Sequence, residues 1–413
     1  MRYLILFLTL TLSPPLLSNT YEISDIDGNE ITVEVMPSDG ELLLIWLVDH
    51  EEQRPVFEAL VQAVNDSGVE IWRVDLLNDY FLPRSSEAVR TLPGKGVASL
   101  IDAAHRNSSK KIVLAAYDRM PLPLLRGVRH WQEKATESRL AGALLFYPNL
   151  FGPPPLAGQP PEVDPVLHAT NIPLVIFQPA LGSQRWRLNQ IMQPLWKSGA
   201  PAYAYIVPDV RDWFFMGEGS HGPAEQVATG QLPSQIALFA ELLDQHPKPN
   251  SAKPLPDTMP KGKAIRTLVK HTKPEPGPAF SLLDIENKPY SSTQFNDKVV
   301  LLNFWATWCP PCVEELPSLN RLQRRYEGND LEIVSVDFRE SPAQMAAFLA
   351  ETPVDFPVLM DTDGRVSLDW RVFSFPSSFI IDRQGQIRYT ANRAIDWNSE
   401  EVWQAIDSLL VEH

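Results

Sequence analysis

The sequence predicts an α/β protein with two sheet domains joined by a proline-rich linker. On both sides of that linker, short apolar runs alternate with segments of helical periodicity, which is typical of buried strands with crossover helices. The linker itself, residues 246–278, holds eight prolines and is basic, so we expect it to be extended and unable to build a core. The length of 413 residues accommodates two domains of ordinary size.

The first domain, residues 21–245, opens with a predicted hairpin. Residues 21–24 and 31–36 are rich in strand formers and flank the turn Asp27-Gly28. Apolar runs then predict strands at residues 42–48, 69–76, 112–117, 143–147, 174–178 and 202–207. Helical periodicity between these runs predicts helices at residues 56–65, 97–105, 188–196 and 235–243.

The second domain, residues 279–413, repeats the alternation. It predicts a strand at 299–305, a helix at 309–326 and a strand at 331–336. Ser341 and Gln344 form a capping box with proline at the first helical position, which predicts a helix through residue 349. A closing hairpin and an amphipathic helix are expected at residues 379–381, 386–389 and 399–410.

The net charge and the N-terminal residues limit the possible functions. Lysine and arginine total 36 against 51 aspartates and glutamates, and this net charge of −15 argues against a nucleic-acid partner. Met1-Arg2 is followed by an apolar run that is shorter than the ~20 residues of a membrane span, so residues 1–20 are interpreted as a signal peptide. If it stays uncleaved, it anchors the chain to the membrane. The alternative is a buried element of the first domain.

The chain has two cysteines, Cys309 and Cys312, in one C-x-x-C motif at the start of a predicted helix. A helix N-terminus favours a thiolate, and the leading Cys309 is the cysteine that can be exposed there, so it should be the nucleophile and Cys312 the resolving thiol. Half of a zinc site would need two further ligands, and no second C-x-x-C or paired-histidine motif supplies them. A purely structural disulfide across so short a loop would add little stability. Thiol–disulfide exchange is therefore the chemistry that we expect.

The residues around the cysteine pair carry a family resemblance. Residues 303–312 read NFWATWCPPC and are followed by EELP, FPVL precedes an acidic turn at 356–359, and residues 375–382 read FPSSFIID. In these motifs, over about a third of the chain, the second domain resembles the thioredoxin-like domain of TlpA/ResA-type exported thiol–disulfide oxidoreductases. By this resemblance Pro376 is the cis-proline that faces the cysteine pair, Phe375 lies against the substrate backbone, and Trp308 contacts partners.

The resemblance also singles out Glu315 and Asn303. Glu315 matches the active-site glutamate of the family and lies on the same helix face as Cys312, where it can manage the proton of that thiol. The alternative is a first-turn glutamate that favours the helix dipole. Asn303 stands where thioredoxin has a buried aspartate, and this departure shifts the role of base to Glu315.

The first domain resembles an α/β-hydrolase in its order of elements. In residues 112–120 Asp118 occupies the place of the nucleophile, but both glycines of the usual G-x-S-x-G turn are missing and Met120 is bulky. The loop at 179–183 offers no carboxylate for a triad, and His221 is either a surviving catalytic histidine or a solvated loop residue. We therefore expect a domain without hydrolase chemistry that binds or positions something. An active hydrolase using Asp118 and His221 is the alternative.

Together these observations predict an exported, periplasmic disulfide reductase of bacterial type that acts on disulfide-containing client proteins. The resemblance implies re-reduction by a membrane thiol carrier, because an exported protein cannot draw directly on cytosolic reductant. It implies no metal, and no cofactor beyond the redox-active pair Cys309 and Cys312. The alternative function is a bifunctional protein whose first domain is an active hydrolase.

Overall fold

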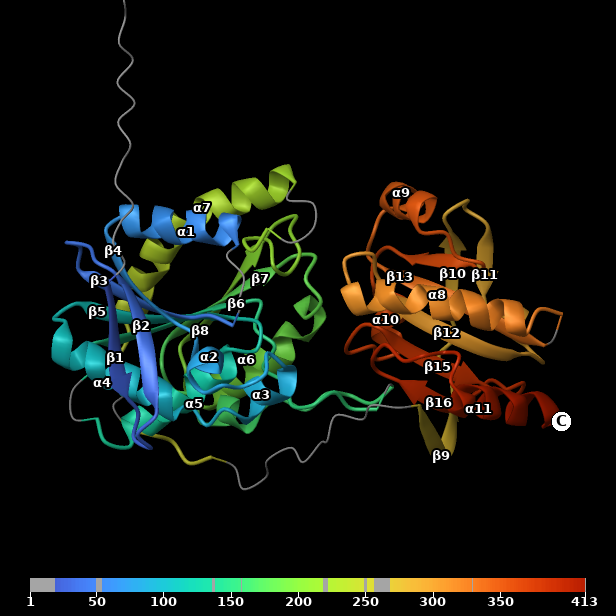
Figure 1. Cartoon of the computed structure of the whole chain (residues 1–413), viewed down its shortest axis with the longest axis horizontal. Coiled ribbons are helices and arrows are strands. Elements are labelled where there is room, and N and C mark those ends of the chain that lie inside the picture. The colour runs from blue at the N-terminus through green and yellow to red at the C-terminus, as the bar shows by residue number, and fades with distance from the viewer. Residues whose placement is uncertain are drawn as a thin grey trace, which may run out of the picture.

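The computed structural model describes residues 19–49, 54–135, 138–156, 158–217, 222–248, 251–255, 268–328 and 330–412. In these residues the strands form two eight-stranded sheets (Figure 1). We refer to each sheet with its helices as the first and the second domain. Residues 1–18 of the expected signal peptide lie outside the described residues, and Asn19 and Thr20 belong to the first strand.

The first sheet has the strand order β1-β2-β4-β3-β5-β6-β7-β8. The predicted hairpin is confirmed, because β1 pairs antiparallel with β2, and β2 pairs antiparallel with β4. From β4 onward neighbouring strands are parallel. The six predicted apolar runs all form strands, with ends that shift by at most three residues. The strands are β1 (Asn19–Ser24), β2 (Glu30–Met36), β3 (Leu42–Leu47), β4 (Val69–Val74), β5 (Lys111–Tyr117), β6 (Leu140–Phe146), β7 (Leu174–Pro179) and β8 (Ala202–Val207).

Helices cover both faces of this sheet (Figure 1). On one face α1 (Pro55–Asp66) packs beside α7 (Pro223–Asp244). The other face is covered by α4 (Lys95–Asn107), α5 (Pro121–Gln132) and α6 (Leu188–Lys197), with the short helices α2 (Leu76–Asp79) and α3 (Ser86–Thr91) nearby.

Four helices of the first domain differ from the prediction: α2, α3 and α5 were not expected, and α7 begins earlier than expected. α5 was not expected, because Pro121 and Pro123 resemble a loop signal, although proline fits the first turn of a helix, where its missing N–H is not needed. α7 begins at Pro223 and not at residue 235, and it continues through Pro233. Its buried residues pack on the sheet on both sides of that proline, so tertiary packing outweighs the local cost.

The second sheet has the order β11-β10-β14-β13-β12-β15-β16-β9. Its central strands β12, β13 and β14 are parallel, and β15 runs antiparallel beside β12. α8 and α11 pack on one face and α10 on the other. The elements are β10 (Ser281–Asp284), β11 (Pro289–Ser291), β12 (Val299–Trp305), α8 (Pro310–Arg325), β13 (Leu331–Phe338), α9 (Pro342–Glu351), β14 (Val358–Asp361), α10 (Arg365–Asp369), β15 (Ser377–Ile381), β16 (Gln386–Ala391) and α11 (Glu400–Val411).

The segment predicted as a linker contains an additional strand. β9 (Val269–Pro276) pairs antiparallel with β16 at the edge of the second sheet. An edge strand tolerates proline because one side of its backbone needs no partner, which explains how Pro274 and Pro276 fit here. The extended linker therefore ends before β9, while residues 256–267 lie outside the described residues.

Side chains join the two domains near the N-terminal end of α8. The buried ring of Phe373, in the loop before β15, belongs to the hydrophobic core of the first domain and meets Phe151 edge-on at 5.4 Å between centroids. Arg187 donates a hydrogen bond to the Val372 carbonyl at 2.8 Å, and Arg339 donates one to the Ala180 carbonyl at 3.0 Å. Ala180 follows β7, so the carboxyl end of the first sheet lies against the second domain. No helix in the described part of the chain is long and apolar enough to cross a bilayer.

Candidate active site

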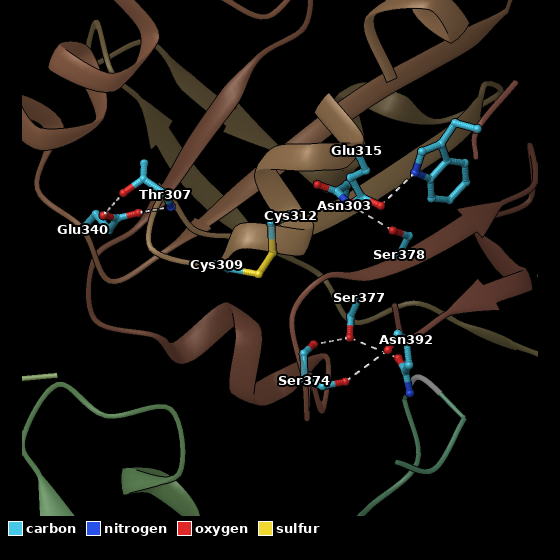
Figure 2. Close-up of a disulfide and its surroundings, with 11 residues drawn as sticks. Asn303, Thr307, Cys309, Cys312, Glu315, Glu340, Ser374, Ser377, Ser378 and Asn392 are labelled. Atoms are coloured by element: carbon cyan, nitrogen blue, oxygen red, sulfur yellow. Dashed lines mark hydrogen bonds between the residues drawn. A yellow bond between two sulfur atoms is a disulfide. The ribbon is translucent and has the colours of Figure 1, made fainter. Parts of the chain in front are cut away.

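The cysteine pair lies at the junction of β12 and α8. Cys309 caps the N-terminus of α8, Pro310 and Pro311 fill the first helical positions, and a disulfide joins Cys309 to Cys312 (Figure 2). The backbone N–H groups of Cys312 and Val313 both donate to the Cys309 carbonyl, at 2.9 and 3.1 Å. Cys309 is 5% exposed and Cys312 is fully buried. Attack from outside can therefore reach Cys309 first.

Glu315 is buried one turn after Cys312 on α8 (Figure 2). Its Oε1 accepts a hydrogen bond from Asn303 Nδ2 at 2.8 Å, and its Oε2 accepts one from Trp397 Nε1 at 3.2 Å. Burial raises the pKa of Glu315 to about 7, while these hydrogen bonds oppose the rise. A buried carboxyl group with this pKa can take up or release a proton near neutral pH.

Asn303 holds Glu315 from the central strand. It is fully buried on β12, opposite Ser378 on β15, and its Nδ2 also donates to Ser378 Oγ at 3.0 Å. An amide supplies two donors, so this one group links the carboxyl group of Glu315 to β15. Asn303 therefore serves as a hydrogen-bond donor to Glu315.

The loop that leads into Cys309 is held by Glu340, which sequence reasoning missed. The carboxylate of Glu340 accepts hydrogen bonds from Thr307 N–H and from Thr307 Oγ1, both at 2.7 Å (Figure 2). Glu340 follows β13, the parallel neighbour of β12, and is buried. The Glu340 N–H donates to Asp337 at 3.1 Å, and burial together with Glu340 raises the pKa of Asp337.

The peptide bond between Phe375 and Pro376 is cis, and Phe375 packs against the core cluster that contains the cysteine pair. The ring of Phe375 meets Trp308 edge-on at 5.8 Å and packs against Phe338 at 4.9 Å. Ser377 next to this bond donates to the Ser374 carbonyl at 2.6 Å (Figure 2). The ring of Phe375 thus lies against Trp308, the residue that directly precedes Cys309.

Residues of the first domain also reach this region, and no sequence motif indicated them. Arg211, in the loop after β8, places its guanidinium 5.4 Å from the centroid of the Trp308 ring. Its Nη2 donates to the Arg339 carbonyl at 2.8 Å. The ring next to Cys309 is therefore contacted by both domains.

The carboxyl end of the first sheet carries its own polar cluster. Asp118 follows β5 in a left-handed turn, with φ of 49°, and its carboxylate pairs with Arg119 at 2.6 Å. The sharp turn forms without the expected glycines, because Met120 turns into the core below and is fully buried. The bulk of Met120 is therefore not an obstacle to this turn, contrary to the sequence-based expectation.

Two further carboxyl groups lie within electrostatic reach of Asp118. Asp212, after β8, accepts hydrogen bonds from Ser183 N–H and Oγ, both at 2.8 Å, and burial raises its pKa to about 6. Asp49, after β3, also has a pKa raised to about 6 by burial and then by the charge of Asp118. His221 lies outside the described residues, so no contact with Asp118 is defined.

The described residues contain no group of three or more histidine, cysteine, aspartate or glutamate side chains arranged to hold a metal ion. The chemistry that the site offers is that of the sulfur pair and of the buried carboxyl group beside it.

Comparison with known proteins finds relatives of the second domain. Residues 275–390 match the AhpC/TSA family model. The thiol–disulfide oxidoreductase ResA of Bacillus thuringiensis subsp. konkukian (strain 97-27) is 36% identical over 110 residues, which are 27% of this chain and 64% of that protein. ResA of Geobacillus thermodenitrificans (strain NG80-2) is 30% identical over 132 residues, 32% of this chain and 75% of that protein.

Among solved structures, a thiol:disulfide interchange protein of the thioredoxin family from Chlorobium tepidum TLS aligns with a TM-score of 0.30 and 24% identity. That alignment covers 34% of this chain and 99% of the other. The chain spans 64% of the length of the first relative named above.

Proposed function

Through its second domain the chain belongs to the ResA-type thiol–disulfide oxidoreductases, and on this premise we propose that the whole protein is an exported reductase of protein disulfides. The observation that carries the proposal is the disulfide between Cys309 and Cys312 at the N-terminus of α8, with Cys309 as the more exposed sulfur. A helix N-terminus stabilises the thiolate that exchange requires.

The reaction transfers two electrons from the reduced pair to the client. The Cys309 thiolate attacks one sulfur of the client disulfide, forms a mixed disulfide and releases the second client sulfur as a thiolate, which takes up a proton. Cys312 then loses its proton and attacks the Cys309 sulfur. The first client sulfur leaves as a thiol, and the Cys309–Cys312 disulfide remains, which is the state of the structure.

Glu315 is the proposed acceptor of the Cys312 proton. It lies three residues after Cys312 on α8, so both side chains project from the same helix face. Its raised pKa, about 7, matches the proton affinity that a general base needs near neutral pH. The buried hydrogen bonds from Asn303 and Trp397 keep the carboxyl group at this position. The burial and the raised pKa of Glu315 favour its role as proton acceptor over the alternative of a glutamate that only complements the helix dipole.

Trp308, Phe375 and Pro376 are the proposed contact surface for the client. Trp308 is 36% exposed and directly precedes Cys309, and the ring of Phe375 packs against it. Aromatic rings beside a reactive sulfur supply apolar contact to a peptide segment of varied sequence.

The proposed location is the periplasm, with a membrane thiol carrier as the source of electrons. The support is the leader-like sequence of residues 1–20 and the lack of a direct route from cytosolic reductant to an exported protein. If the leader is retained, it holds the protein at the membrane that contains the carrier. Fractionation of cells that express the full chain, with and without residues 1–20, tests both the export and the anchor.

The first domain is proposed to bind or position the client, on a scaffold of the α/β-hydrolase type. The strand order, the left-handed turn at Asp118 after β5 and the helices on both sheet faces support that fold. Ligands of such open α/β sheets bind outside the carboxyl ends of the strands. In this chain that edge lies beside Trp308 and therefore next to the redox pair.

Hydrolysis by the first domain is the second candidate function. One observation favours it: Asp118 sits on the sharp turn where a hydrolase nucleophile stands, with Asp212 and Ser183 hydrogen-bonded nearby. Turnover of a panel of generic esters that is lost in Asp118→Asn and in His221→Ala would support this function. Absence of turnover across the panel would remove it.

The main test follows the client itself. In Cys312→Ser the mixed disulfide on Cys309 cannot be resolved, so the variant expressed with its leader should accumulate clients that mass spectrometry identifies. Purified wild-type protein should reduce a model disulfide, and Cys309→Ser should be inactive. Full activity of Cys309→Ser would exclude the mechanism, and accumulation of small thiols alone on Cys312→Ser would exclude protein clients.

A further inference from the structure

Three arginines gather where the carboxyl end of the first sheet meets the redox domain. Arg185 and Arg211 come from the loops after β7 and β8, and Arg339 follows β13 in the second domain. Arg211 donates to the Arg339 carbonyl, Arg339 donates to the Ala180 carbonyl, and the Arg339 guanidinium lies 5.0 Å from the centroid of the Trp186 ring. The charges of Arg211 and Arg185 both act on Arg339. The Arg211 guanidinium therefore lies at the Arg339 backbone, the Arg339 guanidinium lies over the Trp186 ring, and Arg185 directly precedes Trp186 in the chain.

These three guanidinium groups form no ion pair with a carboxylate in the described part of the chain. Arg211 Nη1 and Arg339 Nε are in addition buried without a hydrogen-bond acceptor. Clustered, partly desolvated cations repel one another, and this arrangement is costly unless an anion completes it.

The carboxyl groups whose charges act on Arg211 and Arg339 form no ion pair with them, although Asp212 Oδ1 and Asp337 Oδ1 have no hydrogen-bond partner within the described residues. Asp212 accepts two hydrogen bonds from Ser183, and Asp361 accepts the N–H groups of Val366 and Ser367 at 3.1 and 2.8 Å. Asp363 lies 3.2 Å from Arg365. Asp337, on which the charge of Arg211 also acts, accepts the Glu340 N–H and has a pKa raised by burial and by Glu340, while Glu340 accepts both hydrogen bonds from Thr307.

The cluster also has a fixed place relative to the reactive sulfur. The guanidinium of Arg211 contacts the ring of Trp308, and Trp308 is the residue before Cys309. An anionic group held by the cluster is thereby placed at the rim of the redox site, on the side of the first domain.

We propose that Arg185, Arg211 and Arg339 form a binding site for acidic side chains that flank the client's disulfide. This inference rests on the proposed function, because it assigns the substrate preference of the same redox site. A guanidinium offers a planar fork of donors that matches a carboxylate, and the rings of Trp186 and Trp308 add apolar contact for the peptide around it. The overall charge of −15 repels acidic proteins elsewhere on the surface, so this cationic cluster directs them to one place.

The test uses two peptides that differ only in charge. Each carries one intramolecular disulfide, flanked by two glutamates in one peptide and by two glutamines in the other. Reduced full-length protein is mixed with each peptide at low ionic strength, and alkylation of the remaining thiols followed by mass spectrometry gives the second-order rate constant. We expect the glutamate peptide to react about tenfold faster, and this ratio should fall towards one in roughly 0.5 M salt.

The variant Arg185→Gln separates recognition from docking of the domains, because no hydrogen bond of the Arg185 side chain joins the two domains in the described residues. It should lower the glutamate-to-glutamine ratio to about threefold and leave the rate with the glutamine peptide unchanged, whereas Arg185→Lys should retain most of the preference. The matched control Arg106→Gln removes the same charge from the exposed face of α4 and should keep the tenfold ratio.

Two results would overturn the inference: equal rates for the two peptides with the wild-type protein, or a ratio that Arg185→Gln leaves unchanged. Both leave the reductase function intact, because the glutamine peptide is still reduced. If the protein reduces neither peptide, the proposed function itself fails.

Discussion

The buried carboxyl group of Glu315 makes stability depend on pH in a predictable direction. Its pKa is raised from an ordinary 4.5 to about 7, because the folded protein withholds water from the charged form. Between these two values the folded state binds more protons than the unfolded state, so stability falls as the pH rises. A shift of this size corresponds to a loss of about 2–3 kcal/mol between pH 5 and pH 8.

The perturbation is Glu315→Gln in the oxidised protein, where no thiol titrates. The amide cannot ionise, so the free energy of unfolding of the variant does not fall between pH 5 and pH 8 through this group. Its free energy of unfolding relative to wild type should therefore rise by about 2–3 kcal/mol from pH 5 to pH 8, whatever the constant cost of the altered hydrogen bonds. Urea unfolding of both proteins at the two pH values measures the change, and the contribution of the unaffected first domain cancels in the difference.

The matched control is Glu314→Gln, the exposed neighbour on α8, which should alter the free energy of unfolding by less than about 0.5 kcal/mol at either pH. The raised pKa would be refuted if the difference in free energy of unfolding between wild type and Glu315→Gln stays constant from pH 5 to pH 8. The role of Glu315 in proton transfer would then lose its physical basis.

Further predictions concern the surroundings of the redox pair. Glu340→Gln leaves one acceptor oxygen for the two donors of Thr307, so the free energy of unfolding of the oxidised protein in urea should fall by about 1–3 kcal/mol. An unchanged midpoint would contradict the proposal that Glu340 holds the loop before Cys309. Phe375→Ala removes the edge contact with Trp308 and should raise KM for a peptide disulfide about fivefold. The rate with a small neutral dipyridyl disulfide should stay within twofold of wild type. Equal effects on the two substrates would argue against contact between Phe375 and the peptide. Phe373→Ala should lower the free energy of unfolding of the first domain by about 3–5 kcal/mol, and a value near zero would show that this ring is dispensable to its core.

The strands were predictable because their residues are buried on both faces. β3, β5 and β7 are almost wholly buried, and a continuous apolar run is the direct signature of such strands. The elements that escaped prediction are those in which tertiary contacts outweigh local signals. β9 is a run of lysines and prolines that becomes a strand only because β16 offers it an open edge.

The redox pair and its partners were predictable to different degrees. Cys309 and Cys312 are identified by spacing alone, and Glu315 by its place one turn further on. Glu340 follows the cysteines by some thirty positions in sequence and reaches Thr307 only through the parallel pairing of β12 with β13. The available signal was an acidic residue two positions after β13 (Leu331–Phe338). Arg211 had no such signal, because its contact with Trp308 depends on how the two domains meet.

The position of Phe373 determines where this protein can be divided. By sequence the residue belongs to the second domain, yet its ring completes the core of the first. A fragment that ends at the linker loses a buried ring, and a fragment that begins after the linker exposes that ring and the Val372 carbonyl to water. If the chain is divided at the linker and the two fragments are produced separately, both should therefore be poorly soluble. The two domains should therefore be produced as one chain, although each has a sheet of its own.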